Sequence, residues 1–233
     1  MKRSLLAVSA SLALLSMTGV AQAAADINAG QQKSASCGSC HGKDGNSAVP
    51  MFPKLAAQNE EYLVKQMQAF KDGSRAGATM GAMVQGLSTN DMQDIAAYYE
   101  AQQVTKNALP PLDFEDEDDD GEPLGKKQLA ANKKAATDEQ TALLAIGFDV
   151  YRNGDLENEI SACIACHGPY GEGNKPASFP ALKSQHADYM IKTLTDFKTG
   201  VRSNDSDNMM HMIAKKMSNK EIKALSYYMS GLR

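Results

Sequence analysis

The apolar residues of this chain follow a helical period in two well-separated segments. Over residues 60–71 and 187–198 they recur every three or four positions, as on a helix with one buried face. Gly73 and Gly200 follow these segments, which is typical of a helix C-terminus. No segment keeps the strict apolar–polar alternation of a half-buried strand, so the pattern predicts an all-α protein.

Two more amphipathic segments begin with the same capping signal. Ser88 is followed three residues later by Asp91, and Ser218 by Glu221, and apolar residues at helical spacing come next. Each segment is expected to be the last helix of its part of the chain. Residues 27–36 and 139–152 are further helix candidates.

The chain contains an internal repeat. "FPKLAAQNEEYLVKQMQAFKDGSR", residues 52–75, matches "FPALKSQHADYMIKTLTDFKTGVR", residues 179–202, at a constant offset. The simplest interpretation is two homologous helical domains, which we place at residues 26–104 and 138–233.

The segment between the two domains, residues 105–137, differs from both in composition. Seven of the eight positions from 113 to 120 are acidic, and such a run repels itself and cannot build a core. We therefore expect an exposed acidic linker. Its role stays open between a solvated spacer and a docking surface for a basic partner.

The first 25 residues have the layout of a secretory signal peptide. Lys2 and Arg3 precede an apolar stretch, and small residues ending in Ala23 follow it. Cleavage near residues 23–25 is expected, with an uncleaved anchor as the alternative, and the predicted location is the periplasm. No later stretch is long and apolar enough to span a membrane. Loss of Lys2 and Arg3 takes the net charge from −4 to about −6, which argues against a nucleic-acid partner.

All four cysteines lie in two Cys-x-x-Cys-His motifs, "CGSCH" and "CIACH". Disulfides, a thiol redox pair or a zinc site would each explain cysteine pairs in an exported protein. Disulfides do not require the adjacent histidine, a thiol redox pair needs a strand-to-helix setting, and the long spacing favours two separate sites. The motif is the attachment signature of c-type haem.

Haem attachment explains why the motif contains two cysteines and an adjacent histidine. Two thiols about one helical turn apart can form thioethers to the two vinyl groups on one edge of a haem, and the next imidazole can reach its iron. The prediction is two covalently attached haem c groups. Cys37, Cys40, Cys163 and Cys166 would be the tethers, and His41 and His167 the iron ligands.

The second axial ligand decides whether each iron is closed or open to small molecules. Met80 lies seven residues before Leu87, and Met210 lies seven before Met217, so the two methionines hold equivalent places in the repeat. They are the predicted sixth ligands. The competing candidates are Met83, Met209, Met212 and His211. His186 has Asn59 as its counterpart and is expected at the surface.

These motifs together resemble the class I cytochromes c, and specifically the dihaem cytochrome c4 family. The resemblance runs from "CGSCHGKDGNS" and "FPKLAAQ" to "NDSDNMMHMIAKKMSNKEIKALSYYMSGL" and covers essentially the whole mature chain. It implies two tandem cytochrome c-like domains related by a pseudo-twofold axis, with haems near their interface. It also implies a periplasmic electron carrier that serves a terminal oxidase or another respiratory reductase.

The resemblance assigns further residues to the haem sites. Backbone carbonyls at Pro53 and Pro180 would accept the Nδ1 proton of the histidine ligands. Arg75 and Arg202 are candidates to pair with haem propionates, with a surface charge at a helix end as the alternative. Lys54 of the first copy is replaced by Ala181 in the second, which predicts unequal haem surroundings and unequal potentials.

Three classes of function remain at this stage: an electron carrier, a haem enzyme, and a binding module that senses a gas or a redox state through an open iron. An electron carrier has redox partners, namely an upstream donor and a membrane oxidase or reductase, which it could meet as a soluble protein or by peripheral membrane contact. A dihaem peroxidase or a haem subunit of a periplasmic oxidoreductase needs one iron with an open position. The equivalent methionines favour the carrier and predict that the protein is not an enzyme.

Overall fold

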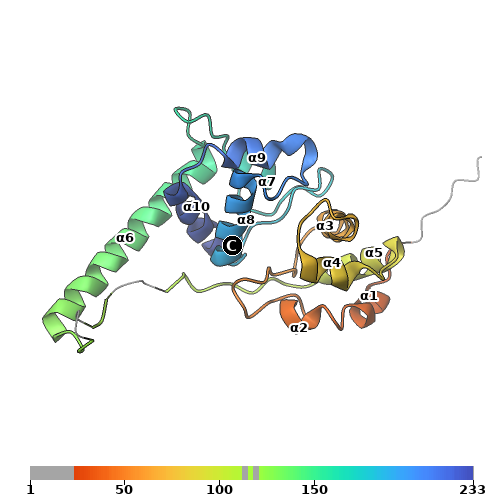
Figure 1. Ribbon diagram of the computed structural model, residues 1–233, viewed down its shortest axis with the longest axis horizontal. Helices are drawn as coiled ribbons and strands as arrows, with labels where there is room; N and C mark the ends of the chain where they lie inside the picture. The colour runs from red at the N-terminus through yellow and green to blue at the C-terminus, as the bar shows by residue number, and fades with distance from the viewer. Residues whose placement is uncertain (1–23, 112–114, 118–120, 233) are drawn as a thin grey trace, which may run out of the picture.

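The computed structural model describes residues 24–111, 115–117 and 121–232, and these form two helical domains joined by an extended segment (Figure 1). Residues 1–23 of the predicted signal peptide and most of the acidic run lie outside the described residues. Among the residues that are described, strand pairing is limited to three isolated bridges. The predicted all-α, two-domain fold is confirmed.

The N-terminal domain is built from five helices. They are α1 Ile27–Lys33, α2 Gly38–His41, α3 Glu60–Asp72, α4 Ala78–Val84 and α5 Thr89–Glu100. The first helix packs on the last, and α3 packs against both α5 and α4. The core between them is apolar and includes the fully buried ring of Tyr99.

The C-terminal domain repeats this order of helices. They are α6 Lys126–Asn153, α7 Ile164–His167, α8 Ala187–Thr199, the 3₁₀ turn Ser206–Asn208, α9 Met209–Ala214 and α10 Asn219–Gly231. Here α6 packs on α10, while α8 packs against α10 and α9. Each expected helix is present, and α2, α4, α7 and α9 are additional short helices.

A glycine permits the first and last helices of each domain to cross in backbone contact. A Cβ atom at Gly30 of α1 would lie 1.9 Å from the carbonyl oxygen of Asp94 in α5. At Gly147 of α6 it would lie 2.2 Å from the carbonyl oxygen of Ala224 in α10. Because no side chain fits in either gap, these two positions fix the closest approach of the helices.

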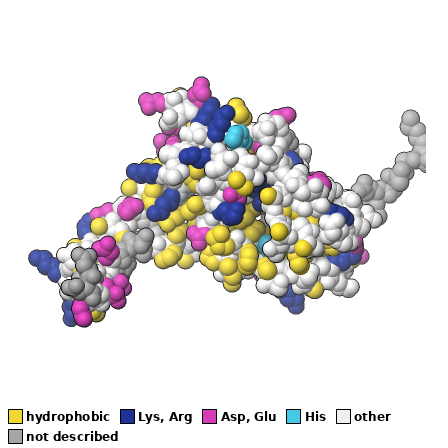
Figure 2. All heavy atoms as spheres, viewed as in Figure 1, with side chains coloured by type: hydrophobic (Ala, Val, Ile, Leu, Met, Phe, Trp, Pro, Cys, Tyr) yellow, Lys and Arg dark blue, Asp and Glu magenta, His cyan; other side chains and the backbone are white. Residues whose placement is uncertain are grey.

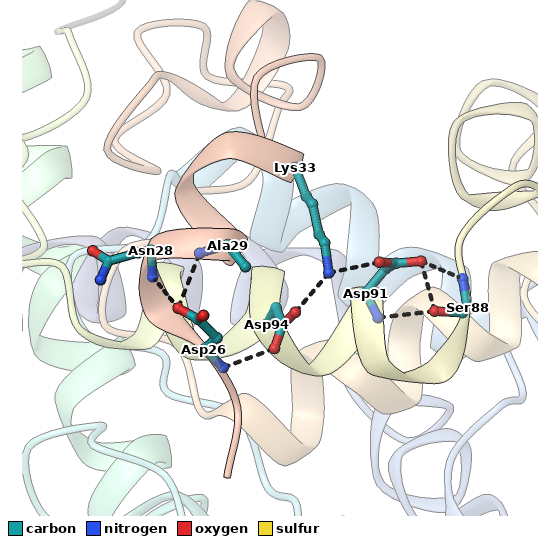
Figure 3. Close-up of polar contacts among 7 residues, drawn as sticks. All are labelled: Asp26, Asn28, Ala29, Lys33, Ser88, Asp91 and Asp94. Atoms are coloured by element: carbon teal, nitrogen blue, oxygen red, sulfur yellow. Dashed lines mark hydrogen bonds and ion pairs between the residues drawn. The ribbon is translucent and has the colours of Figure 1, made fainter. Parts of the chain in front are cut away.

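Charged side chains tie α1 to α5 (Figure 3). The Lys33 ammonium lies 2.7 Å from a carboxylate oxygen of Asp91 and 2.6 Å from one of Asp94. Asp94 also accepts a 2.8 Å hydrogen bond from the backbone N–H of Asp26, whose own carboxylate caps α1. Asp91 completes the predicted capping box with Ser88, and Ser218 begins α10 with the same arrangement.

Helix α6 begins earlier than the sequence pattern indicated. Residues 126–137, expected in the linker, are helical because eight of the twelve are alanine or lysine, which favour helix. This part of α6 projects from the domain, with charged side chains of both signs at its tip (Figures 1 and 2). The incoming segment runs beside it: Gln140 Nε2 donates to the Pro110 carbonyl at 2.8 Å.

Candidate haem sites and the domain interface

The two Cys-x-x-Cys-His motifs form identical local structures. Each is a single helical turn, α2 or α7, that begins after the first cysteine and ends at the histidine. Gly42 and Gly168 follow with φ values of 81° and 80°, a conformation that favours glycine and turns the chain away. All four cysteines are unpaired and half-buried. The two thiols of a pair are therefore held about one turn apart, next to the imidazole.

The two histidines make the same contact with a prolyl carbonyl. His41 Nδ1–H donates to the Pro53 carbonyl at 2.9 Å, and His167 Nδ1–H donates to that of Pro180 at 2.9 Å. Both imidazoles are buried, and burial lowers their pKa despite the opposing effect of these hydrogen bonds. Each ring is thus neutral near pH 7 and keeps the Nε2 lone pair available to a metal.

The protonation of the thiols argues against disulfide exchange. Burial raises the pKa of Cys37, and it raises the pKa of Cys163 to about 12. Redox-active cysteine pairs need a lowered thiol pKa, because the thiolate is the nucleophile. A shared zinc site is also unsupported, since the two pairs lie in different domains. No group of three or more His, Cys, Asp or Glu side chains with metal-site geometry occurs among the described residues.

The predicted methionine ligands lie on α4 and α9, two short helices that the sequence pattern did not predict. Met80 is in α4 and Met210 is in the first turn of α9, and both are partly buried. The Met210 backbone N–H donates to Asp205 Oδ2 at 2.6 Å, and its side chain packs against the same core as Cys163.

The competing candidates are placed differently. Met83, Met209 and Met212 are 43%, 36% and 48% exposed. His211 is partly buried and donates from Nδ1 to the Phe197 carbonyl at 2.7 Å. Met80 and Met210 are therefore the better-buried thioethers of their helices.

This donor set fits a haem better than a bare metal ion. Each domain offers two thiols, one neutral imidazole oriented through Nδ1, and one partly buried thioether. Imidazole and thioether are the axial ligands of low-spin cytochromes, and paired thiols on one helical turn match the vinyl edge of the porphyrin.

The comparisons with known proteins agree with this chemistry. The family model for cytochrome c matches residues 27–103 and 144–233. Cytochrome c4 of Azotobacter vinelandii is 44% identical over 231 residues, covering 95% of this chain and 96% of that protein. The chain belongs to the cytochrome c4 family. It is similarly 42% identical over 222 residues to cytochrome c4 of Pseudomonas aeruginosa, with 95% of this chain and 96% of that protein covered.

A solved structure shares the same architecture. The crystal structure of reduced recombinant cytochrome c4 from Pseudomonas stutzeri superposes with a TM-score of 0.75 at 40% identity, covering 90% of this chain and all of that one. As a member of the cytochrome c4 family, the protein carries two covalently attached haem c groups, and the Cys37/Cys40 and Cys163/Cys166 pairs fit their attachment motifs. It is an electron-transfer protein that works with redox partners.

Reciprocal glutamine contacts join the two domains of this cytochrome next to its histidine–proline pairs. Gln185 binds both backbone groups of Lys54: its Nε2 donates to the Lys54 carbonyl at 2.9 Å, and its Oε1 accepts from the Lys54 N–H at 2.8 Å. Gln58 makes the equivalent pair of contacts with Ala181, at 3.0 and 2.8 Å. We call these four hydrogen bonds the glutamine clamp. Their reciprocity is what a pseudo-twofold relation between the domains requires.

Two more side chains at equivalent places in the repeat contact the opposite domain, although they reach non-equivalent residues there. Asn59 Nδ2 donates to the Phe179 carbonyl at 2.7 Å, and its counterpart His186 donates from Nε2 to the Ser47 carbonyl at 2.8 Å. His186 is half-buried in the interface. The expectation that His186 is a surface residue was wrong, because its imidazole contacts the N-terminal domain just as Asn59 contacts the C-terminal domain.

The two arginines also lie at this interface. Arg202 donates to the Tyr62 hydroxyl at 3.0 Å, and Arg75 donates to the Tyr189 hydroxyl at 3.1 Å, each reaching into the other domain. Both guanidinium groups also donate to Gln66 Oε1. Burial alone would raise the pKa of Tyr189, but the two arginines outweigh it and lower that pKa to about 8. Two cations held by neutral partners are suited to bind an anion between the domains.

The sequence contains a signal that could have helped to predict the interface residues. Gln58 and Gln185, and likewise Tyr62 and Tyr189, are identical between the two copies of the repeat. Identity in a repeat does not say whether a residue faces its own core or the other domain. The structure resolves that choice, since each of these side chains contacts the opposite domain.

Proposed function

We propose that this protein is a periplasmic electron carrier that takes electrons from an upstream donor and delivers them to a terminal oxidase or another respiratory reductase. The observation that carries the proposal is the equivalence of the two sites. Each combines two free thiols, a buried histidine held by a prolyl carbonyl, and a partly buried methionine. Two closed sites of one kind suit electron storage and transfer better than substrate chemistry.

The proposed roles follow from the donor set. Cys37 and Cys40 would tether the N-terminal haem, and His41 and Met80 would ligate its iron. In the C-terminal domain Cys163 and Cys166 would be the tethers, and His167 and Met210 would ligate the iron. A bound haem supplies an iron that exchanges one electron between its ferric and ferrous states.

The chain itself supplies orientation and electrostatics. The Pro53 and Pro180 carbonyls fix the rotation of the histidine rings and keep Nε2 directed away from its own backbone. Arg75 and Arg202 are proposed partners of haem propionates. Their support is that the described partners of both guanidinium groups are largely neutral hydroxyl and amide oxygens.

The proposed location rests on the first 25 residues. Their basic start, apolar stretch and small residues favour export and cleavage. Within the described part of the chain, no helix combines the length and apolar character that crossing a bilayer demands. We propose that partners are met through weak, transient contacts, as is usual for electron-transfer complexes.

The carrier role can be tested with the haem-loaded protein and bacterial membranes that contain a terminal oxidase. We expect the reduced protein to be reoxidised by oxygen rapidly when membranes are present and slowly when they are absent. Hydrogen peroxide added without membranes should not be turned over. Catalytic peroxide consumption by the protein alone would instead support the enzyme alternative.

A further inference from the structure

Lys54 is a buried cation beside the N-terminal histidine–proline contact. It directly follows Pro53, whose carbonyl accepts the His41 proton. The residue is 4% exposed, and its ammonium donates to the Thr105 carbonyl at 2.6 Å and to the Thr105 hydroxyl at 3.2 Å. The equivalent place beside Pro180 is occupied by Ala181, which has no charge.

The charge of Lys54 is only weakly compensated. Among the described residues, no carboxylate lies within ion-pair distance of its ammonium. Asp44 acts on it through space, but Asp44 is exposed and hydrogen-bonds Asn46 instead. Burial lowers the pKa of Lys54, with Asp44 opposing, as is characteristic of an ammonium that loses more hydration than it regains. A charge in this setting is screened less than one in water.

Hydrogen bonds hold Lys54 in this place from both sides. The glutamine clamp fixes its backbone through Gln185. Its acceptor Thr105 is fixed in turn, because the Thr105 N–H donates to Asn46 Oδ1 at 2.7 Å. The ammonium therefore cannot swing into solvent without breaking contacts with the linker.

We propose that Lys54 tunes the N-terminal haem: its fixed positive charge raises the reduction potential of that haem above the value that a neutral side chain would give. The inference rests on the proposed ligation of this haem by His41. Reduction adds one electron to the site, so a nearby positive charge stabilises the reduced form. Ala181 gives the C-terminal haem no such stabilisation, and position 54 thereby contributes to the difference between the two haems.

Potentiometric titration of the full haem-loaded chain tests this role. In Lys54→Met, we expect one of the two one-electron waves to move to lower potential and the other to stay. A tenfold change in the ferrous-to-ferric ratio of that haem corresponds to about 59 mV. Lys54→Arg keeps the charge and should leave both waves near their original potentials. Lys43→Met removes an exposed charge from the same domain and should have a much smaller effect.

The outcomes separate this proposal from the ligation on which it rests. Met210→His exchanges the proposed ligand of the other haem and should move the wave that Lys54→Met leaves in place. If Lys54→Met moves neither wave, moves both equally, or moves the same wave as Met210→His, the proposal is overturned. A shift in Lys54→Arg as large as that in Lys54→Met would also overturn the proposal, because it would show that packing rather than charge sets the potential. If Met210→His moves neither wave, the proposed methionine ligation fails by itself.

Discussion

The methionines illustrate how one residue can be selected from several of the same type. The chain has 13 methionines, and most are suited to filling irregular core space. Met80 and Met210 stand out because they hold equivalent places in the repeat and are more buried than their neighbours Met83 and Met212. A thioether that binds iron must be turned toward the interior of its domain.

The ligand assignment predicts a specific spectroscopic loss. Met80→Ala and Met210→Ala should each remove about half of the charge-transfer absorption that links methionine sulfur to ferric iron, because each variant affects one of two haems. Met83→Ala and Met212→Ala are matched controls from the same helices and should retain the full band. A control variant that loses half of the band would transfer the ligand role to that methionine.

At the scale of elements, the helix crossings predict at which positions an added methyl group destabilises the protein most. Gly30→Ala and Gly147→Ala would each drive a Cβ atom into a backbone carbonyl of the facing helix. We expect each to lower the free energy of unfolding by about 1–3 kcal/mol or more, as overpacking does. Denaturant unfolding of the haem-loaded protein measures this.

Gly86→Ala is the control for these variants. It has open space around the added Cβ and no positive φ. Its effect should stay within about 0.5 kcal/mol. Equal destabilisation by all three changes would contradict the account of the crossings.

The tie between α1 and α5 predicts a dependence of stability on pH. Lys33 lowers the pKa of both Asp91 and Asp94, so their stabilising effect is complete above the ordinary aspartate pKa of about 3.9. It is lost as the pH falls below this value and the carboxylates become protonated. Removing Lys33 should therefore reduce the stability lost in acid.

The measurement is the free energy of unfolding between pH 7 and pH 3 for Lys33→Met and the unchanged protein. The variant should be less stable at pH 7, and the two curves should converge in acid. Lys134→Met removes an exposed ion pair with Asp138 and should leave the shape of the curve unchanged. Parallel curves for Lys33→Met and the unchanged protein would contradict the role of the tie.

At the scale of the whole molecule, the glutamine clamp directly joins the two segments that follow Pro53 and Pro180. Replacing both Gln58 and Gln185 with alanine removes four hydrogen bonds between the domains, each worth about 1 kcal/mol. We expect the domains to separate more readily, with a larger radius of gyration in small-angle scattering and earlier unfolding. Gln128→Ala, on the projecting part of α6, should change neither. An unchanged radius of gyration in the double variant would contradict this prediction, because it would show that other contacts hold the domains together without the glutamine clamp.

The sequence was sufficient for the domains but not for their association. Helical periods, capping boxes and the repeat predicted most helices, because these signals are local. The spacing of Cys, His and Met predicted the donor set. The start of α6 was predicted too late, because the helix-forming segment 126–137 follows the acidic run closely and was assigned to the same linker. The interface positions of Arg75, Arg202 and His186 depend on how two folded domains meet, which no local pattern encodes.

Carbon monoxide binding to the reduced protein tests the central claim that both irons are closed by a histidine and a methionine. The absorption spectrum of the fully reduced, haem-loaded chain should be the same before and after mixing with carbon monoxide at neutral pH. Rapid formation of a carbon monoxide complex at either haem would show an open iron and would contradict the assignment of this protein as an electron carrier.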